Sequence, residues 1–424
     1  MRSKTSRLFL FLALLFSLTA CGERFNSPQG DHLPPSPAPL HESAATTDSP
    51  IVREAAPRNT PQAAPQIATA IISEAPLGMN SITGVEGISN TGTAEAPSSD
   101  LLTPTLTLSP TPIRAALRQL TSGGCCVGPF WSPDGREVLY IDRPSPTDTP
   151  GVWGVAVDGG EPHLVTDKVG VYSADMRWRA FPGAGLVVVE NMETGQRWNV
   201  GNGGKAVTFS PDDSQIAWTA GQSGPPYDSA QRKIWVSERD GSHAREVATV
   251  YGGGFAGWFP DGRLLATGRM KPSEKGEAFW VITPEGGAYQ EIARGADIRG
   301  WELSPEGDWL VYLIAFSEDP QENGLWLANT NSGERYLLPV FGAFHWRDAT
   351  RLLVVPLDTR ETFHRLLEVD VNDIQQGNFG THLLVTPANT RFKIANGDWS
   401  VSPDGGAIAF VSAQDHNIWL IELP

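Results

Sequence analysis

The segment FWSPDGREVLY, residues 130–140, joins a Ser-Pro-Asp-Gly turn to a run of β-branched and aromatic residues. Proline sets φ for a tight turn, aspartate bonds back to the backbone, and glycine permits a positive φ. The run Val138-Leu139-Tyr140 has the composition of a strand. The segment therefore predicts one short strand, a tight turn and a second strand.

Related segments recur along the chain, and their spacing decides the fold. Clear copies are TFSPDDSQIAW at Thr208, GWFPDGRLLAT at Gly257, ELSPEGDWLVY at Glu302 and SVSPDGGAIAF at Ser400. Degenerate copies, RWRAFPGAGLVVV at Arg177 and HWRDATRLLVV at His345, fill the two longer gaps. The resulting period of about 40 to 50 residues is typical of propeller blades. We count seven units; because the degenerate copies lack the Ser-Pro-Asp-Gly turn, six irregular blades are the alternative.

Each unit continues with the same order of elements. A variable polar loop leads to a third strand, usually centred on tryptophan: Trp153, Trp198, Trp235, Trp280, Trp326 and Trp419. A glycine turn and a last apolar run, such as HLVT at residues 163–166, complete the unit. This order predicts an all-β protein, a single β-propeller with blades of four antiparallel strands. We interpret the tryptophans as packing residues, since a large flat ring fills the space between neighbouring sheets.

The two ends of the repeat region predict how the ring closes. The last unit stops after its third strand, NIWLIEL, residues 417–423. The run AALRQLT, residues 115–121, precedes the first unit and matches the fourth strands of the others. We predict that this N-terminal strand pairs into the last blade, which removes exposed sheet edges. The propeller would then span residues 112–424.

The turn, the third-strand tryptophan and the QLT-type fourth strand together resemble the TolB-type, WD-like β-propeller repeats. The resemblance covers residues 115–424 and is specific to the repeat. It implies the fold and not a function. TolB itself also carries an α/β domain before its propeller, whereas this chain has a leader and a polar segment in that place.

The N-terminal segment predicts export. Residues 1–20 combine a basic start, an apolar run and small residues, as in a secretory signal. Leu18-Thr19-Ala20-Cys21 resembles a bacterial lipobox, which implies that Cys21 is lipidated and begins the mature chain. The protein would be anchored at the cell envelope, in the outer membrane of a diderm host or on the outer face of the cytoplasmic membrane of a monoderm host. Residues 21–111, rich in Pro, Ala, Ser and Thr, are expected to form a disordered tether.

Composition and motifs exclude several function classes. A net charge of -16 makes the chain a poor partner for nucleic acid. The nearest match to a hydrolase nucleophile motif, GQSGP at residues 221–225, lacks the second glycine. The 8 histidines show no metal-ligand spacing. We therefore assign no catalytic residue, metal or cofactor, and expect a monomer.

Strand order predicts which face binds. The loops between second and third strands, with the loops that enter each blade, share one face and are long and variable, as binding loops usually are. The candidate contacts there are Tyr227 in the longest loop, and Arg299 and Asp398 at the starts of innermost strands. Cys125 and Cys126 lie in the loop that enters the first blade. They form either a vicinal disulfide, which an oxidising compartment permits, or two small residues at a crowded turn.

Two functions remain open on the sequence. The first is a surface-tethered scaffold that binds an extracytoplasmic protein, peptide or glycan. The second is an extracytoplasmic propeller enzyme, such as a lactonase, lyase or hydrolase, with a site in the central channel. A scaffold fits the lipobox, the tether and the failed catalytic motifs, so catalysis is uncertain and is the alternative.

Overall fold

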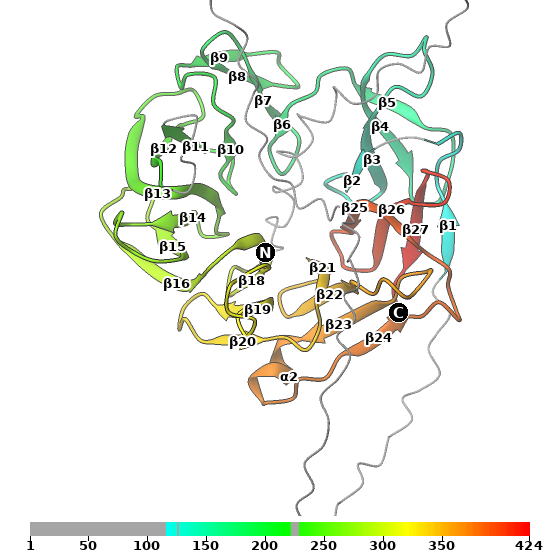
Figure 1. The fold of residues 1–424 in the computed structure, drawn as a ribbon. Coiled ribbons are helices and arrows are strands. Elements are labelled where there is room, and N and C mark those ends of the chain that lie inside the picture. Colours follow the sequence, from blue (N-terminus) through cyan, green and yellow to red (C-terminus); the bar gives the residue numbers. More distant parts are fainter. Residues whose placement is uncertain (1–115, 125–126, 222–228) are drawn as a thin grey trace, which may run out of the picture.

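The strands are arranged in small antiparallel sheets around a central opening (Figure 1). The structure, a computed structural model, describes residues 116–124, 127–221 and 229–424. Five sheets have four strands and one has seven. In the seven-stranded sheet the long strand β13 (Arg245–Trp258) pairs through its first half with β12 and through its second half with β14. It therefore serves two blades, and the ring has seven blades, as predicted.

Four blades come from the first part of the chain. Blade 1 contains β2 (Val127–Trp131), β3 (Glu137–Asp142), β4 (Gly151–Ala156) and β5 (His163–Thr166). Blade 2 contains β6 (Val171–Tyr172), β7 (Trp178–Pro182), β8 (Val187–Asn191) and β9 (Arg197–Val200). Blade 3 contains β10 (Thr208–Phe209), β11 (Gln215–Gly221), β12 (Gln231–Glu238) and the first half of β13. Blade 4 contains the second half of β13, β14 (Leu264–Arg269), β15 (Glu277–Ile282) and β16 (Tyr289–Gly295).

The remaining three blades follow in chain order. Blade 5 contains β17 (Ile298–Leu303), β18 (Trp309–Ile314), β19 (Gly324–Asn329) and β20 (Arg335–Leu337). Blade 6 contains β21 (Gly342–Trp346), β22 (Arg351–Pro356), β23 (Leu366–Asp370) and β24 (His382–Val385), with the short helix α2 (Val371–Gln375) after β23. Blade 7 contains β25 (Ile394–Val401), β26 (Ala407–Ser412), β27 (Ile418–Glu422) and β1 (Leu117–Gln119). Within the described ranges, no helix is long and apolar enough to cross a membrane.

The ring closes as the sequence predicts. β1 pairs antiparallel with β27, with Leu117 opposite Ile421 and Gln119 opposite Trp419. Beyond β1, the Thr121 hydroxyl accepts a hydrogen bond from the Ile418 amide at 2.9 Å. A strand from the start of the described chain thus completes the last blade.

The Ser-Pro-Asp-Gly turn has the chemistry expected of it. In blade 1, the Ser132 hydroxyl donates to Asp134 at 2.7 Å and accepts from the Glu137 amide at 3.0 Å. Asp134 also accepts from the Arg136 amide at 3.1 Å, and Gly135 has a φ of 74°. Ser210 and Ser402 begin turns with the same two serine bonds. Each turn therefore fixes the angle between the first and second strands of its blade.

Blade 2 corrects the predicted alignment of the copy at Arg177. Its turn is Ser173-Ala174-Asp175-Met176, in which Ser173 donates to Asp175 at 2.8 Å and accepts from the Trp178 amide at 3.0 Å. Met176 takes the glycine position with a φ of 61°. The Pro-Gly-Ala-Gly stretch is instead the loop between the second and third strands. Trp198 therefore lies on β9, the fourth strand, and not on the third as predicted.

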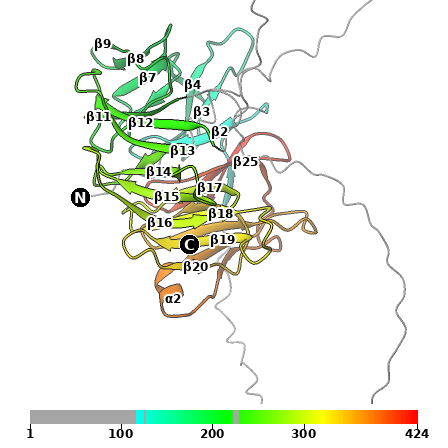
Figure 2. The ribbon, with the colours of Figure 1, turned by 60° about the vertical axis from the view of Figure 1, so that its left-hand side comes forward.

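The core lies between the blades rather than in one place. In β14, Leu264 and Ala266 pack in a cluster shared with blade 3, whereas Leu265 packs in the cluster shared with blade 5. Both faces of the sheet are therefore buried, which explains the continuous apolar runs in second strands. Figure 2 shows the strands of blades 4 and 5 one above another.

Innermost-strand tryptophans link consecutive blades by hydrogen bonds. The indole N–H of Trp131 points to the carbonyl of Ser400 at 3.4 Å, that of Trp258 to Thr208 at 3.2 Å, and that of Trp346 to Glu302 at 3.2 Å. In each case the acceptor belongs to the innermost strand of the preceding blade. These bonds fix neighbouring innermost strands around the channel.

Candidate functional site

Two of the predicted site residues lie in the described part of the chain. Arg299 is on β17 and Asp398 on β25, both on innermost strands as predicted. The innermost strand of blade 6 lies between them in the ring, so the structure does not bring the two together. Cys21, Cys125, Cys126 and Tyr227 lie outside the described residues.

Arg299 belongs to a charged group where blades 4 and 5 meet. Its guanidinium contacts the Asp297 carboxylate at 2.9 Å, and the two side chains are 43% and 41% exposed. Burial raises the pKa of Glu277, at the start of β15, and the charges of Arg269 and Arg299 oppose that rise. The group therefore mixes both signs and offers polar contacts rather than a field of one sign.

Asp398 is the predicted residue with the strongest perturbation. Burial raises the pKa of its carboxyl to about 6, although a hydrogen bond from the Gly128 amide partly offsets the rise. Gly128 lies on β2 of the neighbouring blade 1. Asp398 therefore links the two blades that flank the ring closure.

The loop between β18 and β19 presents an aromatic side chain and is tied to the backbone of Asp297. Phe316 is 86% exposed, and its φ is 70°, a region that bulky residues rarely adopt. The loop is braced from within, because the Ser317 amide donates to the Asn323 side chain at 2.9 Å. The Ala315 amide also donates to the Asp297 carbonyl at 3.3 Å. Phe316 is therefore held at the surface by ordered backbone on both sides.

Third-strand tryptophans fasten the loops of this face. The indole N–H of Trp326 donates to the Glu322 carbonyl at 2.8 Å, and that of Trp153 to the Thr149 carbonyl at 3.2 Å. Trp419 donates to the Asp415 carboxylate at 3.1 Å. In blade 4, Trp280 donates to the Gly268 carbonyl at 2.9 Å, at the end of the second strand. The tryptophans read from the sequence as packing residues thus also anchor the loops above them.

A second group lines the inner wall between blades 5, 6 and 7. His345 Nδ1 lies 2.9 Å from Glu302 Oε2, and the His345 ring meets the Trp399 ring edge-on at 4.5 Å between centroids. The side chains of Glu302 and His345 are 14% and 25% exposed. In the described ranges, no three His, Cys, Asp or Glu residues gather closely enough to hold a metal ion.

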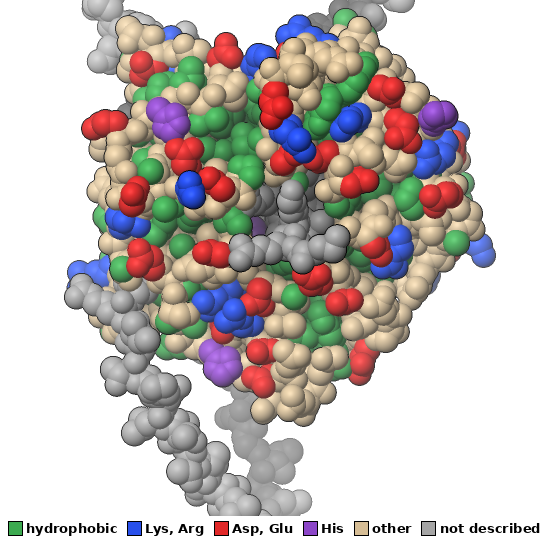
Figure 3. All heavy atoms as spheres, turned by 180° about the vertical axis from the view of Figure 1, so that it is seen from behind, with side chains coloured by type: hydrophobic (Ala, Val, Ile, Leu, Met, Phe, Trp, Pro, Cys, Tyr) green, Lys and Arg blue, Asp and Glu red, His purple; other side chains and the backbone are tan. Residues whose placement is uncertain are grey.

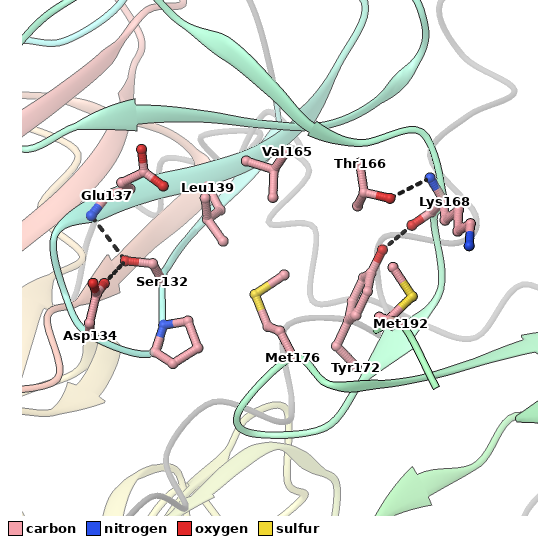
Figure 4. A pocket seen from close by; sticks show the side chains of 11 residues that line it. Ser132, Asp134, Glu137, Leu139, Val165, Thr166, Lys168, Tyr172, Met176 and Met192 are labelled. Atoms are coloured by element: carbon pink, nitrogen blue, oxygen red, sulfur yellow. Dashed lines mark hydrogen bonds between the residues drawn. The ribbon is translucent and has the colours of Figure 1, made fainter. Parts of the chain in front are cut away.

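The interface of blades 1 and 2 is open. It holds a cavity of about 680 Å³, where Met176 and Met192 lie beside Tyr172 and face Leu139 and Val165 (Figure 4). Blade 2 also replaces an apolar strand pair with a buried ion pair, Arg179 and Glu190, 2.5 Å apart. Burial alone would raise the pKa of Glu190, but hydrogen bonds from Arg197 and Lys168 and the charge of Arg179 hold it below its usual range.

The missing tryptophan explains why this interface is open. Five third strands carry tryptophan on the side that packs against the preceding blade: Trp153, Trp235, Trp280, Trp326 and Trp419. In blade 2, Val188 pairs with Phe181 at the equivalent position. A valine leaves unfilled the space that an indole fills elsewhere.

Figure 3, which shows the ring from behind, has acidic and basic side chains interspersed over that face.

Sequence reasoning missed Phe316, Glu302 and His345 as site residues. Phe316 had one readable signal, a large aromatic in a loop of the predicted binding face. Glu302 and His345 occupy the same position in consecutive repeat copies, two residues before the turn. Aligning that column would have placed them on neighbouring innermost strands, but not at hydrogen-bond distance.

Trp326→Phe tests the loop anchor. Phenylalanine keeps the packing of the ring and loses the bond to Glu322, so amide exchange in residues 315–323 should rise about five- to tenfold. Hydrogen–deuterium exchange measures it. Trp301→Phe is the control, because it removes an indole bond to the Ala256 carbonyl instead. A rise in the 315–323 segment for both variants, or for neither, contradicts the anchoring role.

Asp398→Asn tests the buried carboxyl. Since the folded pKa is about 6 and the ordinary value 3.8, the folded state holds the proton more tightly, and Asp398 lowers stability as pH rises between these values. The variant should therefore be more stable than the native protein by about 1–2 kcal/mol at pH 7, with the difference lost below pH 4. Urea unfolding at several pH values measures this. A difference that does not change with pH contradicts the assignment.

Comparison with solved structures shows the fold. Oligogalacturonate lyase from Vibrio parahaemolyticus is similar at 12% identity and a TM-score of 0.52, covering 74% of this chain and 98% of that protein. TolB from Acinetobacter baumannii matches at 14% identity and a TM-score of 0.35, covering 61% of this chain and 63% of that one. The propeller domain of the Trilobed protease from Pyrococcus furiosus matches at 13% identity and a TM-score of 0.38, covering 72% and 81%. No protein-family model and no curated protein sequence matches the chain. At these identities the likeness shows a β-propeller and no function.

Proposed function

We propose that this protein is an envelope-tethered scaffold whose propeller binds an extracytoplasmic protein, peptide or glycan. The binding face consists of the loops between second and third strands together with the channel mouth. Residues 21–111 would hold that face away from the membrane, and lipidated Cys21 would anchor it.

The observation that carries the proposal is the presentation of Phe316. Phe316 is 86% exposed, and a partner that covers its ring would gain about 25 cal/mol for each Å² of apolar surface removed from water. Its backbone has a strained φ of 70°, and such strain persists where the surroundings fix it. The loop is fastened by Trp326 below and by Asp297 at the side. A rigid aromatic with an accessible ion pair next to it has the composition of an interface anchor.

A photo-reactive residue at position 316 tests the binding face. With p-benzoylphenylalanine replacing Phe316 in cells that make the protein, irradiation should give a defined cross-linked species. The same residue at Tyr289, an exposed position on β16 of the outer rim, is the matched control and should give at least about fivefold less. Adding Arg299→Ala should reduce the yield at 316. Equal yields at both positions would count against a binding face at these loops.

Cys21→Ser tests the anchor. The native protein should incorporate labelled palmitate and sediment with membranes, because acylated cysteine gives stable attachment. The variant should lose the label and move to the soluble or secreted fraction. Cys125→Ser should behave as the native protein. Palmitate on the Cys21→Ser variant would rule out the lipidation site.

Catalysis at the channel wall is the second candidate, and the pair of Glu302 and His345 favours it. A carboxylate 2.9 Å from an imidazole nitrogen orients the ring and supports proton transfer. The ring edge against Trp399 fixes the imidazole further. This geometry suits a general base, but a general base alone does not define a reaction, so binding remains the proposal.

A further inference from the structure

A groove at the border of blades 5 and 6 opens on the predicted binding face. Its volume is about 640 Å³. We name it the blade 5–6 groove and define it by its apolar walls and charged rim: Phe341, Leu357, Leu367, Phe379, Asp358, Arg360 and Arg365. It is built by the linker that enters β21, the loop between β22 and β23, and the segment after α2.

The groove exists because blade 6 lacks the third-strand tryptophan. Leu367 on β23 pairs with Val354 on β22, the pair position that tryptophan occupies in five other blades. In blade 5 that position is Trp326, opposite Tyr312. Those indoles fill the interface with the preceding blade, and leucine is too short to do so. The groove therefore occupies the place that a flat indole ring fills in five other blades.

Polar and apolar side chains share the lining of the groove, and three of the apolar ones are uncovered. Phe341, Leu357 and Phe379 are 37%, 47% and 45% exposed. Leu383 on β24 pairs with Leu367 and is 46% exposed, which extends the apolar surface along the same side of the blade. Exposed apolar side chains that adjoin one another mark interaction sites more often than scattered ones do.

The rim of the groove carries Asp358, Arg360 and Arg365, and Glu361 lies in the same exposed loop. The carboxylate of Asp358 contacts both Arg360, at 3.3 Å, and Arg365, at 3.1 Å. Asp358 is 18% exposed, whereas the side chain of Arg360 is 90% exposed. One carboxylate therefore serves two guanidinium groups, and the guanidinium pair can accept a second carboxylate.

We propose that the blade 5–6 groove receives a segment of a partner protein that carries an aromatic side chain next to a carboxylate. The aromatic ring lies where the third-strand indole lies in other blades, and the carboxylate meets Arg360 and Arg365. The chain's own tether, residues 21–111, fits poorly, because its single aromatic residue, Phe25, has Arg24 and Asn26 as neighbours and not a carboxylate. The inference rests on the proposed function, since it names the partner chemistry of the same face.

Titration of the full chain with N-acetyl-Asp-Trp-amide tests the proposal. Binding is measured by the broadening of the indole NMR signals of the peptide. We expect a dissociation constant of about 0.1–1 mM. Leu367→Trp restores the common residue, fills the groove and should weaken binding at least tenfold. Val188→Trp places the same residue in blade 2 and should leave the affinity within twofold. Equal weakening by both variants, or by neither, overturns the proposal.

Three further probes separate the occupants. N-acetyl-Asp-Ala-amide and N-acetyl-Lys-Trp-amide should each bind at least fivefold more weakly, and a trigalacturonate should not compete. Competition by the trigalacturonate would assign the groove to acidic glycans and overturn the proposal of a protein segment. If Leu367→Trp does not fold, Phe379→Ser, at an exposed position, replaces it with the same expectation. Loss of peptide binding with cross-linking at position 316 intact rejects this inference alone, whereas loss of both rejects the proposed function.

Discussion

The indole of an innermost-strand tryptophan crosses from its own blade to the main chain of the blade before it, and the ring depends on that contact. Trp131, Trp258 and Trp346 each donate to a carbonyl of the preceding innermost strand. A carbonyl at the channel wall of a propeller has no strand on its inner side, so the indole N–H supplies a partner that the sheet cannot. The ring itself fills the wedge between two twisted sheets. One residue type therefore satisfies both the packing and the hydrogen bonding of the same joint.

The third-strand tryptophans also combine packing with hydrogen bonding, at a greater distance from the axis of the propeller. They fill the interface and fasten the loop above them, as Trp326 does for the loop that presents Phe316. Where the tryptophan is absent, the joint changes character. Blade 2 has Val188 and, on the same side, the buried pair of Arg179 and Glu190; blade 6 has Leu367 and an open groove. A buried ion pair contributes less to stability than apolar packing of the same volume, so the blade 1–2 joint is expected to be the weaker one.

The sequence predicted the features of the fold that depend on local contacts. The Ser-Pro-Asp-Gly turn is a local, four-residue motif. Its spacing, together with two degenerate copies, led to the count of seven blades, and the pattern of the fourth strands led to the closing strand β1. In blade 2 the corresponding turn has the sequence Ser173-Ala174-Asp175-Met176, without proline or glycine. The sequence alignment therefore matched a glycine-rich loop instead. The serine and aspartate bonds are kept there, so this turn forms without proline or glycine. Arg299 and Asp398 were placed on the correct strands, but their partners, Asp297 and Gly128, depend on geometry at the joints between blades.

The groove was found by comparing the blades for a residue that one of them lacks. Each tryptophan, taken singly, has packing as a sufficient explanation, and none marks a site. Leu367, taken singly, is also an ordinary strand residue. Only the column of third strands shows that blade 6 gives up an indole that five others keep, and the structure shows that neighbouring apolar walls stay exposed rather than collapsing into the space. A blade in a closed propeller has little freedom to shift inward, because it is held by the two blades beside it. The vacancy is therefore preserved by the ring, and a partner's side chain can use it without a rearrangement of the fold.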